Sequence, residues 1–262
     1  MPELPSVEDF RRECTKVVDR KISKVKIIDD YILKTPKSKF KQEIQGKQIK
    51  SVKRWGKYIF LELEGKSNAL LHFGMSGSVR FYTKEIEEPE YSKIILEFED
   101  GTFFSIISVR KFGRVELIGD YKTYVDNNEI GPDALEVSLE EFKEIMDYKK
   151  RSYAKTALMD QSALSGLGNI FSDEILFQAH IYPKTKVSKL HENKIETMFS
   201  LMKEILKKAV DRKLDKNEYP DNFIIPHRDL EDTCPICDTN IKRLEISSRH
   251  SYYCPKCQPK QN

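Results

Sequence analysis

Four cysteines near the end of the chain have the residue type and the spacing of a metal site. Cys234 and Cys237 form one Cys-x-x-Cys pair, and Cys254 and Cys257 form a second pair after sixteen intervening residues. Four thiolates in a tetrahedron suit Zn²⁺. Two disulfides or four free thiols are the alternatives, but we expect no signal peptide before this chain, and paired motifs at this spacing are rarely accidental. We therefore predict one structural Zn²⁺ ion.

The segment between the two cysteine pairs, 238–253, is expected to form a β-hairpin. A zinc ion can replace the core in about thirty residues that could not bury one. The hairpin carries basic, aromatic and hydroxyl side chains of the kind that contact phosphates. These residues are Lys242, Arg243, Arg249, His250, Ser251, Tyr252 and Tyr253.

The start of the chain offers a second kind of chemistry. Removal of Met1 would leave Pro2 with a secondary amine at the terminus, directly before Glu3. Such an amine is partly neutral near physiological pH and can attack an aldehyde carbon to form an iminium, while Glu3 could move protons. A proline at a helix start is also common without any function, so these residues alone leave both interpretations open.

Composition limits the class of protein. The 262 residues suggest two domains, and 39% apolar residues suffice for their cores. The net charge of +3 is small, but residues 34–57 contain nine Lys or Arg against one acid, and residues 85–100 reverse that balance. A basic stretch is either a solvated surface or a site for a polyanion. No run of eighteen apolar residues is present, so we predict no membrane span.

The first half of the chain is expected to be a helix followed by an antiparallel β-sandwich or barrel. Apolar residues fall on one helical stripe within 6–19. Short runs of period two follow, separated by turns such as Glu99-Asp100-Gly101. The expected strands are 22–28, 58–63, 69–73, 79–82, 94–98, 103–107 and 114–117. Loops containing Lys57, an exposed Met75 and Phe112 interrupt this pattern.

The second half is expected to be helical. A linker around Gly131-Pro132 precedes it, and a capping box begins at Ser138. The expected helices are 138–148, 155–163, 170–178 and 188–211. The turn Gly166–Asn169 leads into a helix N-terminus, which either favours a phosphate or is only a tight turn, and Asn169 either caps the helix or donates to a phosphate.

Five separated segments together resemble the formamidopyrimidine-DNA glycosylase/endonuclease VIII family of base-excision repair enzymes. The segments span nearly the whole chain in the family's order. They are Met1–Pro5, Gly56–Tyr58, His72–Ser78, Asp160–Pro183 and Arg249–Gln258. The loop at Met75 is closer to the formamidopyrimidine branch.

The resemblance implies a bifunctional DNA glycosylase and abasic-site lyase. Such enzymes extrude the damaged nucleotide from the duplex. Pro2 would attack C1′ of the deoxyribose, Glu3 would donate and shuttle protons, and β,δ-elimination would cut the strand. The implied catalytic residues are Pro2, Glu3, Lys57 and Arg249.

The resemblance also implies a set of DNA contacts. Lys57, Asn169 and Arg249 match positions that bind phosphates around the lesion. Other residues would fill the space left by the extruded nucleotide or bind DNA nearby, and Glu174 would give structural support. The implied DNA-binding residues are His72, Met75, Arg110, Phe112, Asn169 and Lys155.

This sequence departs from the family at positions that bear on substrate choice. Ser6 replaces a glutamate near the base pocket, Ser108-Val109 replaces Asp-Pro, and Lys111 replaces an arginine. Residues 212–221 lack the Gly-Gly-Thr/Ser run of relatives that prefer 8-oxoguanine. We therefore expect weak or altered 8-oxoguanine recognition, and activity on ring-opened purines, oxidised pyrimidines or abasic sites.

The expected architecture is an α+β protein with an N-terminal catalytic β-sandwich at 1–125 and a linker at 126–135. A helix–two-turns–helix DNA-binding domain at 136–230 and a zinc finger at 231–262 follow. We expect a monomer that acts on double-stranded DNA containing a damaged base or abasic site, in the cytoplasm or on a prokaryotic nucleoid, without a membrane. The alternatives are a non-catalytic damaged-DNA-binding protein on the same scaffold, and a zinc-ribbon interaction module fused to a β-domain. Neither alternative explains why Pro2, Glu3 and Lys57 occur together.

Overall fold

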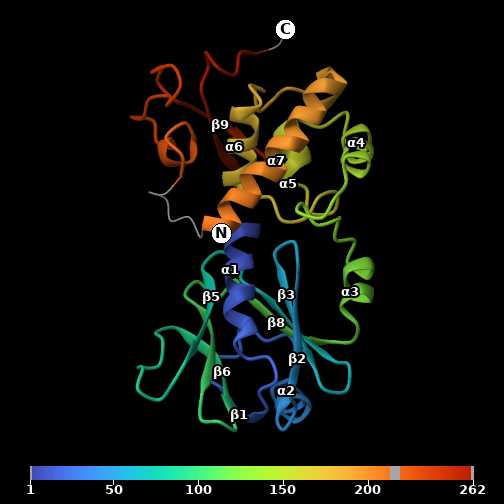
Figure 1. Cartoon of the computed structure of the whole chain (residues 1–262), viewed down its shortest axis with the longest axis vertical. Coiled ribbons are helices and arrows are strands. Elements are labelled where there is room, and N and C mark those ends of the chain that lie inside the picture. Colours follow the sequence, from blue (N-terminus) through green and yellow to red (C-terminus); the bar gives the residue numbers. More distant parts are fainter. Residues whose placement is uncertain (1, 213–218, 261–262) are drawn as a thin grey trace. The chain divides into compact units, whose positions relative to one another are not determined.

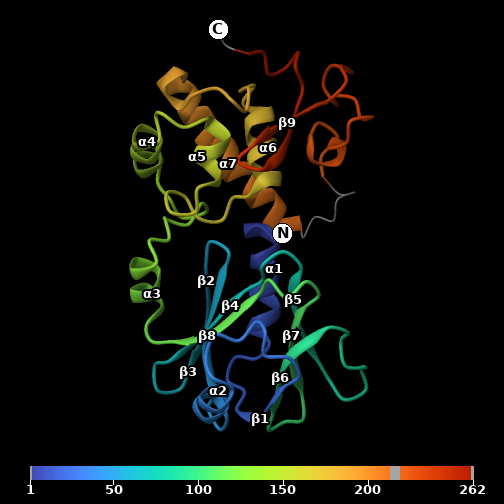
Figure 2. The same cartoon turned by 180° about the vertical axis from the view of Figure 1, so that it is seen from behind.

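The period-two half of the chain forms two antiparallel four-stranded sheets (Figure 1, Figure 2). The computed structural model describes residues 2–212 and 219–260. One sheet has the order β1-β6-β7-β5 and the other β2-β3-β4-β8. The strands are β1 Ile22–Ile27, β2 Ile49–Trp55, β3 Tyr58–Leu63, β4 Asn68–His72, β5 Gly77–Tyr82, β6 Ser92–Phe98, β7 Phe103–Ser108 and β8 Arg114–Ile118. The predicted sandwich is therefore confirmed.

The sandwich has its core between the sheets. Alternate side chains of each strand point inward, such as Leu61 and Leu71 from one sheet and Leu96 and Phe104 from the other. Helix α1, Leu4–Thr15, packs against β2 and β5, which are the edge strands of the two sheets. The helix thus covers one open edge of the sandwich and brings the N-terminal residues to it (Figure 1).

Three elements of the first half were not predicted. They are α2 (Lys37–Ile44), β2 and α3 (Tyr121–Asn127). In β2 only Ile49 is buried, and in α2 only Phe40 and Ile44, a single i, i+4 pair that is too short to establish a helical pattern. Most of the basic stretch 34–57 is therefore ordinary helix and strand surface.

The second half is helical, as predicted, with shifted ends. The helices are α4 Leu139–Tyr148, α5 Ala154–Met159, α6 Asn169–Gln178 and α7 Glu192–Arg212, with 3-10 turns η1 Val187–Lys189 and η3 Ile225–His227. Helix α5 ends four residues before the predicted Ala163. Asp160 accepts hydrogen bonds from Ser162 N (3.0 Å) and Ser162 Oγ (2.7 Å), and this local turn replaces further helical bonds.

The predicted hairpin between the cysteine pairs is confirmed. Strands β9 (Lys242–Ile246) and β10 (Arg249–Tyr253) pair antiparallel. Ser247 and Ser248 connect them, both with positive φ (50° and 57°). Two positive φ angles are the geometry of the tight turn that matches the twist of a hairpin.

The chain divides into two compact units after Glu129. Helix α3 lies in the first unit and extends past residue 125. The division into two units does not test the finer domain limits given above, which stay a prediction. Within the described ranges, no helix combines the length and the apolar character needed to cross a membrane.

Candidate active site

The N-terminal residues are held by the start of α1. Glu3 is the N-cap residue of this helix, and its carbonyl accepts the amide of Val7 at 3.1 Å. Its side chain is only 4% exposed, whereas Pro2 is half-buried. A buried glutamate therefore directly follows the half-buried Pro2. The predicted removal of Met1 concerns a residue outside the described ranges.

Lys57 follows Gly56 in the tight turn between β2 and β3, and its side chain is buried. Gly56 has φ of 55°, which glycine adopts without strain. Arg54 fixes this turn to α1, because its Nη1 donates to Gly56 O at 3.0 Å and its Nε donates to Glu8 Oε2 at 2.9 Å. One guanidinium thus joins the lysine turn to the helix that carries Glu3.

Glu8 also accepts Arg11 Nε at 2.8 Å. Burial raises the pKa of Glu8, but the hydrogen bonds and charges of Arg11 and Arg54 outweigh it, and the pKa lies below its ordinary value. The carboxylate therefore stays charged at neutral pH. Sequence reasoning missed Arg54 and Glu8, because Arg54 lies on a strand that was not predicted and the two residues are 46 positions apart.

His72 ends β4, opposite Tyr58 of β3 and Arg114 of β8. Burial lowers its pKa, and the nearby cations Lys57 and Arg114 lower it further, to about 4. His72 is therefore a neutral imidazole at pH 7, and its ring lies tilted beside that of Tyr58, with 4.9 Å between the two centroids. A neutral ring can offer one hydrogen-bond donor and one acceptor beside the Lys57 cation.

The structure brings Met75, Arg110 and Phe112 together from two loops. Gly74 (φ 57°) lies so close to the second loop that a Cβ there would be 2.2 Å from Phe112 O. Ser76 Oγ accepts the Arg110 amide at 2.9 Å, and the Arg110 guanidinium lies 5.6 Å from the Phe112 ring centroid. Met75 is 44% exposed and Phe112 59%. Two exposed apolar side chains beside a cation suit insertion into a base stack.

In the second unit, Gln161 shapes the turn that precedes α6. Its Nε2 donates to Met159 O and Leu167 O, both at 2.8 Å, and its Oε1 accepts Gly166 N at 3.1 Å. Gly166 has φ of 114°. The turn therefore depends on one side chain and one glycine, and it leads directly into Asn169.

Asn169 is the first residue of α6, and Gly168 is its N-cap. The Asn169 side chain therefore does not cap the helix, which was one of the two interpretations that the sequence left open. Its Nδ2 donates instead to His250 O in β10 at 2.8 Å. Arg249, which is exposed, precedes His250, so the structure places both predicted phosphate ligands of this unit on adjoining elements.

Lys155 is fully buried, and its ammonium contacts the Asp173 carboxylate and Asn169 O (3.2 Å). It therefore lies beneath the α6 turn, with no exposed surface for direct DNA contact. Asp173 and Arg228 were missed by sequence reasoning. Seven consecutive residues of α6, 171–177, are buried, so an acid among them must be paired, but no local pattern in the sequence shows its partners.

Glu174 supports the first residue of η3, as expected of a structural residue. Its carboxylate accepts Ile225 N at 2.9 Å and Gln178 Nε2 at 2.8 Å. Burial raises the pKa of Glu174 to about 7. Residues 213–218, which hold most of the segment expected to affect 8-oxoguanine recognition, lie outside the described ranges.

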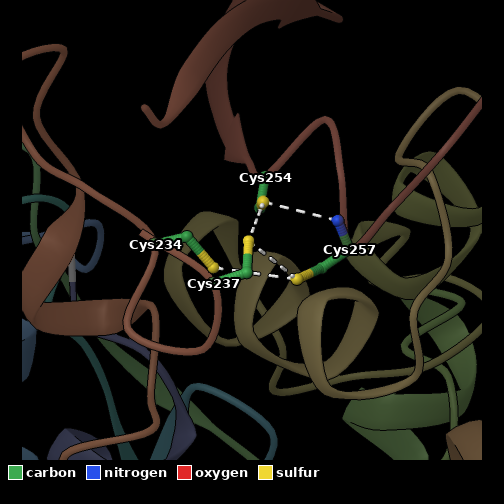
Figure 3. A group of neighbouring side chains, drawn as sticks. All are labelled: Cys234, Cys237, Cys254 and Cys257. Atoms are coloured by element: carbon green, nitrogen blue, oxygen red, sulfur yellow. Dashed lines mark hydrogen bonds between the residues drawn. The ribbon is translucent and has the colours of Figure 1, made fainter. Parts of the chain in front are cut away.

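The four cysteines come together as predicted (Figure 3). All four Sγ atoms lie within 4.8 Å of one another, and the Cys237 Sγ is 3.5 Å from those of Cys254 and Cys257. A tetrahedron of sulfurs about 2.3 Å from zinc has edges of about 3.8 Å. Chemistry and spacing therefore fit one Zn²⁺. The fifth cysteine, Cys14, is buried in α1, where burial raises its pKa.

Three protein-family models match the chain in succession. Residues 1–115 match the formamidopyrimidine-DNA glycosylase N-terminal domain, and residues 130–219 match the H2TH domain of the same enzyme. Residues 232–260 match a zinc finger found in FPG and IleRS. The cysteine cluster is thus a zinc finger of this type, with one structural Zn²⁺.

Relatives that match 98% of this chain give the same result. A formamidopyrimidine-DNA glycosylase of Ligilactobacillus salivarius is 31% identical over 98% of this chain and 99% of its own length. One of Arabidopsis thaliana is 33% identical over 98% of this chain and 71% of its own. A solved complex of Lactococcus lactis FPG with FAPY-dG-containing DNA has a TM-score of 0.88 at 27% identity, covering 98% of this chain and all of that one. A complex of that protein with abasic-site DNA has a TM-score of 0.86 at 27% identity, with the same coverage.

Proposed function

This chain belongs to the formamidopyrimidine-DNA glycosylase family and is a DNA glycosylase of DNA repair, and we propose that it excises damaged bases through the amine of Pro2. Its substrate is double-stranded DNA that contains a damaged base or an abasic site. Support comes from the solved relatives, whose complexes hold FAPY-dG or abasic-site DNA. The observation that carries the mechanism is the buried carboxylate of Glu3 beside Pro2.

The reaction begins once Met1 has been removed. The Pro2 nitrogen forms a bond to C1′ of the deoxyribose, and the N-glycosidic bond breaks with its electron pair leaving on the base. Glu3 protonates the sugar ring oxygen, the C1′–O bond opens, and the nitrogen loses its proton to become an iminium. The position of Glu3 next to Pro2 in the chain suits this transfer, because a proton donor must lie close to the oxygen.

Strand cleavage follows from the same iminium. It acidifies the C2′ proton, whose removal expels the 3′ phosphate, and a second elimination expels the 5′ phosphate. Glu3 is the base or proton shuttle for these steps. The products are a one-nucleoside gap with a phosphate at each end and a sugar fragment that water releases from Pro2.

The remaining residues hold the bent duplex. Lys57, Asn169 and Arg249 bind phosphates around the lesion, and neutral His72 gives a hydrogen bond next to Lys57. Met75, Arg110 and Phe112 occupy the space that the extruded nucleotide leaves, which offsets part of the unstacking cost. Lys155 acts indirectly, because its buried ammonium supports the α6 turn from beneath. Zinc, when bound, supplies folding energy to the hairpin of Arg249 and takes no part in the chemistry.

Substrate choice follows from the departures noted in the sequence. Ser6, Lys111 and the glycine-free segment 212–221 favour ring-opened purines, oxidised pyrimidines or abasic sites over 8-oxoguanine. Lys111 is engaged with Asp29 at 2.7 Å. The protein acts as a monomer, in the cytoplasm or on a nucleoid, with the domain limits expected from sequence.

Borohydride trapping tests this mechanism. The protein, with its N-terminal residue confirmed by mass spectrometry, is incubated with duplexes that carry an abasic site, 8-oxoguanine, a ring-opened guanine or an oxidised pyrimidine. We expect a reduced covalent adduct on Pro2, strongest with the preferred lesion. Absence of any adduct, from protein that begins at Pro2 and binds these duplexes, would instead favour the non-catalytic damaged-DNA-binding protein.

A further inference from the structure

A single buried carboxylate, that of Asp173, joins four segments of the second unit. It contacts the Lys155 ammonium from α5 and accepts Arg228 Nη2 at 2.8 Å from the residue after η3. From β10 it accepts Ser251 Oγ at 2.6 Å and the Tyr252 amide at 3.2 Å. Asp173 has no exposed surface. Its two oxygens therefore receive charge-assisted hydrogen bonds from a helix, a loop and the zinc hairpin.

The hairpin contacts of Asp173 lie next to that of Asn169. The two residues are one helical turn apart on α6, and Asn169 donates to His250 O. Consecutive residues 250, 251 and 252 of β10 are thus held by the first turn and a half of α6. Arg249 comes directly before them, at the start of the strand. The attachment of β10 to α6 therefore fixes the position of the Arg249 backbone, from which its side chain extends.

Both cations of the cluster also contact the first turn of α6. Lys155 Nζ donates to Asn169 O at 3.2 Å and Arg228 Nη2 donates to the same oxygen at 3.4 Å. Two cations and one carboxylate leave a net positive charge beneath a helix N-terminus, where the helix dipole already favours an anion. The arrangement of charge thus suits a phosphate at Asn169.

We propose that Asp173 is a positioning residue for DNA binding, which keeps the Arg249 strand in register with the Asn169 turn so that both side chains meet the phosphates together. This inference rests on the proposed phosphate-binding roles of Arg249 and Asn169. Asp173 itself touches no substrate. Buried ion clusters are seldom more stabilising than apolar packing of the same volume, so a geometric role accounts better for the cluster than stability alone.

A double-mutant cycle on an abasic-site duplex tests the inference. Kd is measured over a series of KCl concentrations for Asp173→Asn, Ser251→Ala, Arg249→Ala and the two combinations with Arg249→Ala. We expect Arg249→Ala to weaken binding roughly tenfold and to reduce the slope of log Kd against log[KCl] by about 1. Asp173→Asn should have a similar effect alone and less than about a twofold further effect in the Arg249→Ala background.

Controls separate positioning from loss of folding. Phe142→Leu, in the packing of α4 against α7, should lower the Tm of the same unit and leave the salt slope unchanged. Zinc content is measured for every variant. Ser251→Ala removes one hydrogen-bond donor to Asp173 and no charge. It replaces Asp173→Asn in the double-mutant cycle if that variant does not fold, and we expect a smaller effect in the same direction.

The outcomes are distinct. Independent, multiplying effects of Asp173→Asn or Ser251→Ala and Arg249→Ala would overturn the positioning role of Asp173 while leaving the function of Arg249 intact. An Arg249→Ala protein with unchanged affinity and salt slope would instead overturn the proposed phosphate contact, and the inference with it. A salt slope lowered equally by Phe142→Leu would show that loss of stability alone produces the effect, and would also overturn the inference.

Discussion

Arg54 and Glu8 form an ion pair of 2.9 Å that joins β2 to α1. Both side chains are largely buried, and the same guanidinium holds the carbonyl of Gly56, next to Lys57. The helix that carries Glu3 and the turn that carries Lys57 are therefore connected through one arginine. Under the catalytic roles proposed for Glu3 and Lys57, this connection would affect the rate, because a small displacement of reacting groups costs a large factor in rate.

Replacement of Glu8 by Gln should destabilise the protein by about 1–3 kcal/mol at pH 7, because a charged hydrogen-bond acceptor is lost. The pKa of Glu8 is depressed in the folded state, so its contribution is complete above the unfolded value near 4.5 and is lost as pH falls through the lower folded pKa. Urea unfolding of both proteins at pH 7 and near pH 3 measures this difference. A gap in stability that stays constant between these pH values would contradict the assignment.

His72 should stay neutral throughout the range in which histidine usually titrates. Its folded pKa of about 4 lies below the ordinary histidine value of 6.5, so the folded state binds fewer protons than the unfolded chain. Its contribution to stability is therefore complete above pH 6.5 and falls as pH drops from 6.5 towards 4. His72→Gln, which keeps a neutral polar side chain, should flatten this dependence. Titration of the imidazole resonances by NMR measures the pKa directly, and a midpoint near 6.5 would contradict the buried, cation-flanked geometry.

The parts of the fold that sequence predicted are those with strong local patterns. The zinc hairpin has fixed cysteine spacing, and the capping box at Ser138 forms as expected, with hydrogen bonds in both directions. Strand β2 was missed because it is basic and only Ile49 is buried. Its partner β3, with four buried residues, was found. Pairing with a neighbour, rather than its own composition, makes β2 a strand.

The candidate site divides in the same way. The four cysteines were recognised by their type and spacing, whereas the roles of Pro2 and Glu3 stay a prediction. Arg54 and Asp173 act through partners 46 and 78 residues away, Glu8 and Ser251, and no local pattern announces such pairs. The same limit applies to Lys155, which the resemblance suggested as a DNA contact and whose buried ammonium instead faces Asp173.

Loss of zinc should abolish DNA binding by the β9–β10 hairpin and leave the β-sandwich folded. Cys254→Ala is expected to lower bound zinc from one ion per chain to none, because three sulfurs do not complete the tetrahedron, and to weaken DNA binding through Arg249. Cys14→Ala is the matched control, since Cys14 is also buried but lies in α1. Atomic emission measures the metal, and circular dichroism the retained strands. Full zinc occupancy in Cys254→Ala would contradict a four-cysteine site.

The exposed side chains of Met75 and Phe112 should matter only on damaged DNA. Met75→Ala and Phe112→Ala are expected to weaken binding to an abasic duplex roughly tenfold and to leave undamaged duplex nearly unaffected, because a void exists only where a nucleotide is extruded. Ile86→Ala is the control, since Ile86 is 42% exposed, close to the 44% of Met75, but lies in another loop. Fluorescence anisotropy with both duplexes measures the effect. Equal losses on both duplexes would argue for general contact instead of void filling.

Gly74 should be the least replaceable glycine of this region. It has φ of 57°, and a Cβ would meet Phe112 O at 2.2 Å and Gly113 N at 2.9 Å, both backbone atoms that cannot turn aside. Gly46 is a matched control, with φ of 81° and open space around the position of a Cβ. Gly46→Ala should cost about 1–2 kcal/mol from backbone strain alone. Gly74→Ala should cost about 1–3 kcal/mol beyond that, because the two loops must separate. The separation should also move Met75 away from Phe112 and lower abasic-site affinity, whereas Gly46→Ala should not change it. Denaturant unfolding and binding, measured on both variants, test these expectations, and equal stability losses would show that the loops yield without cost.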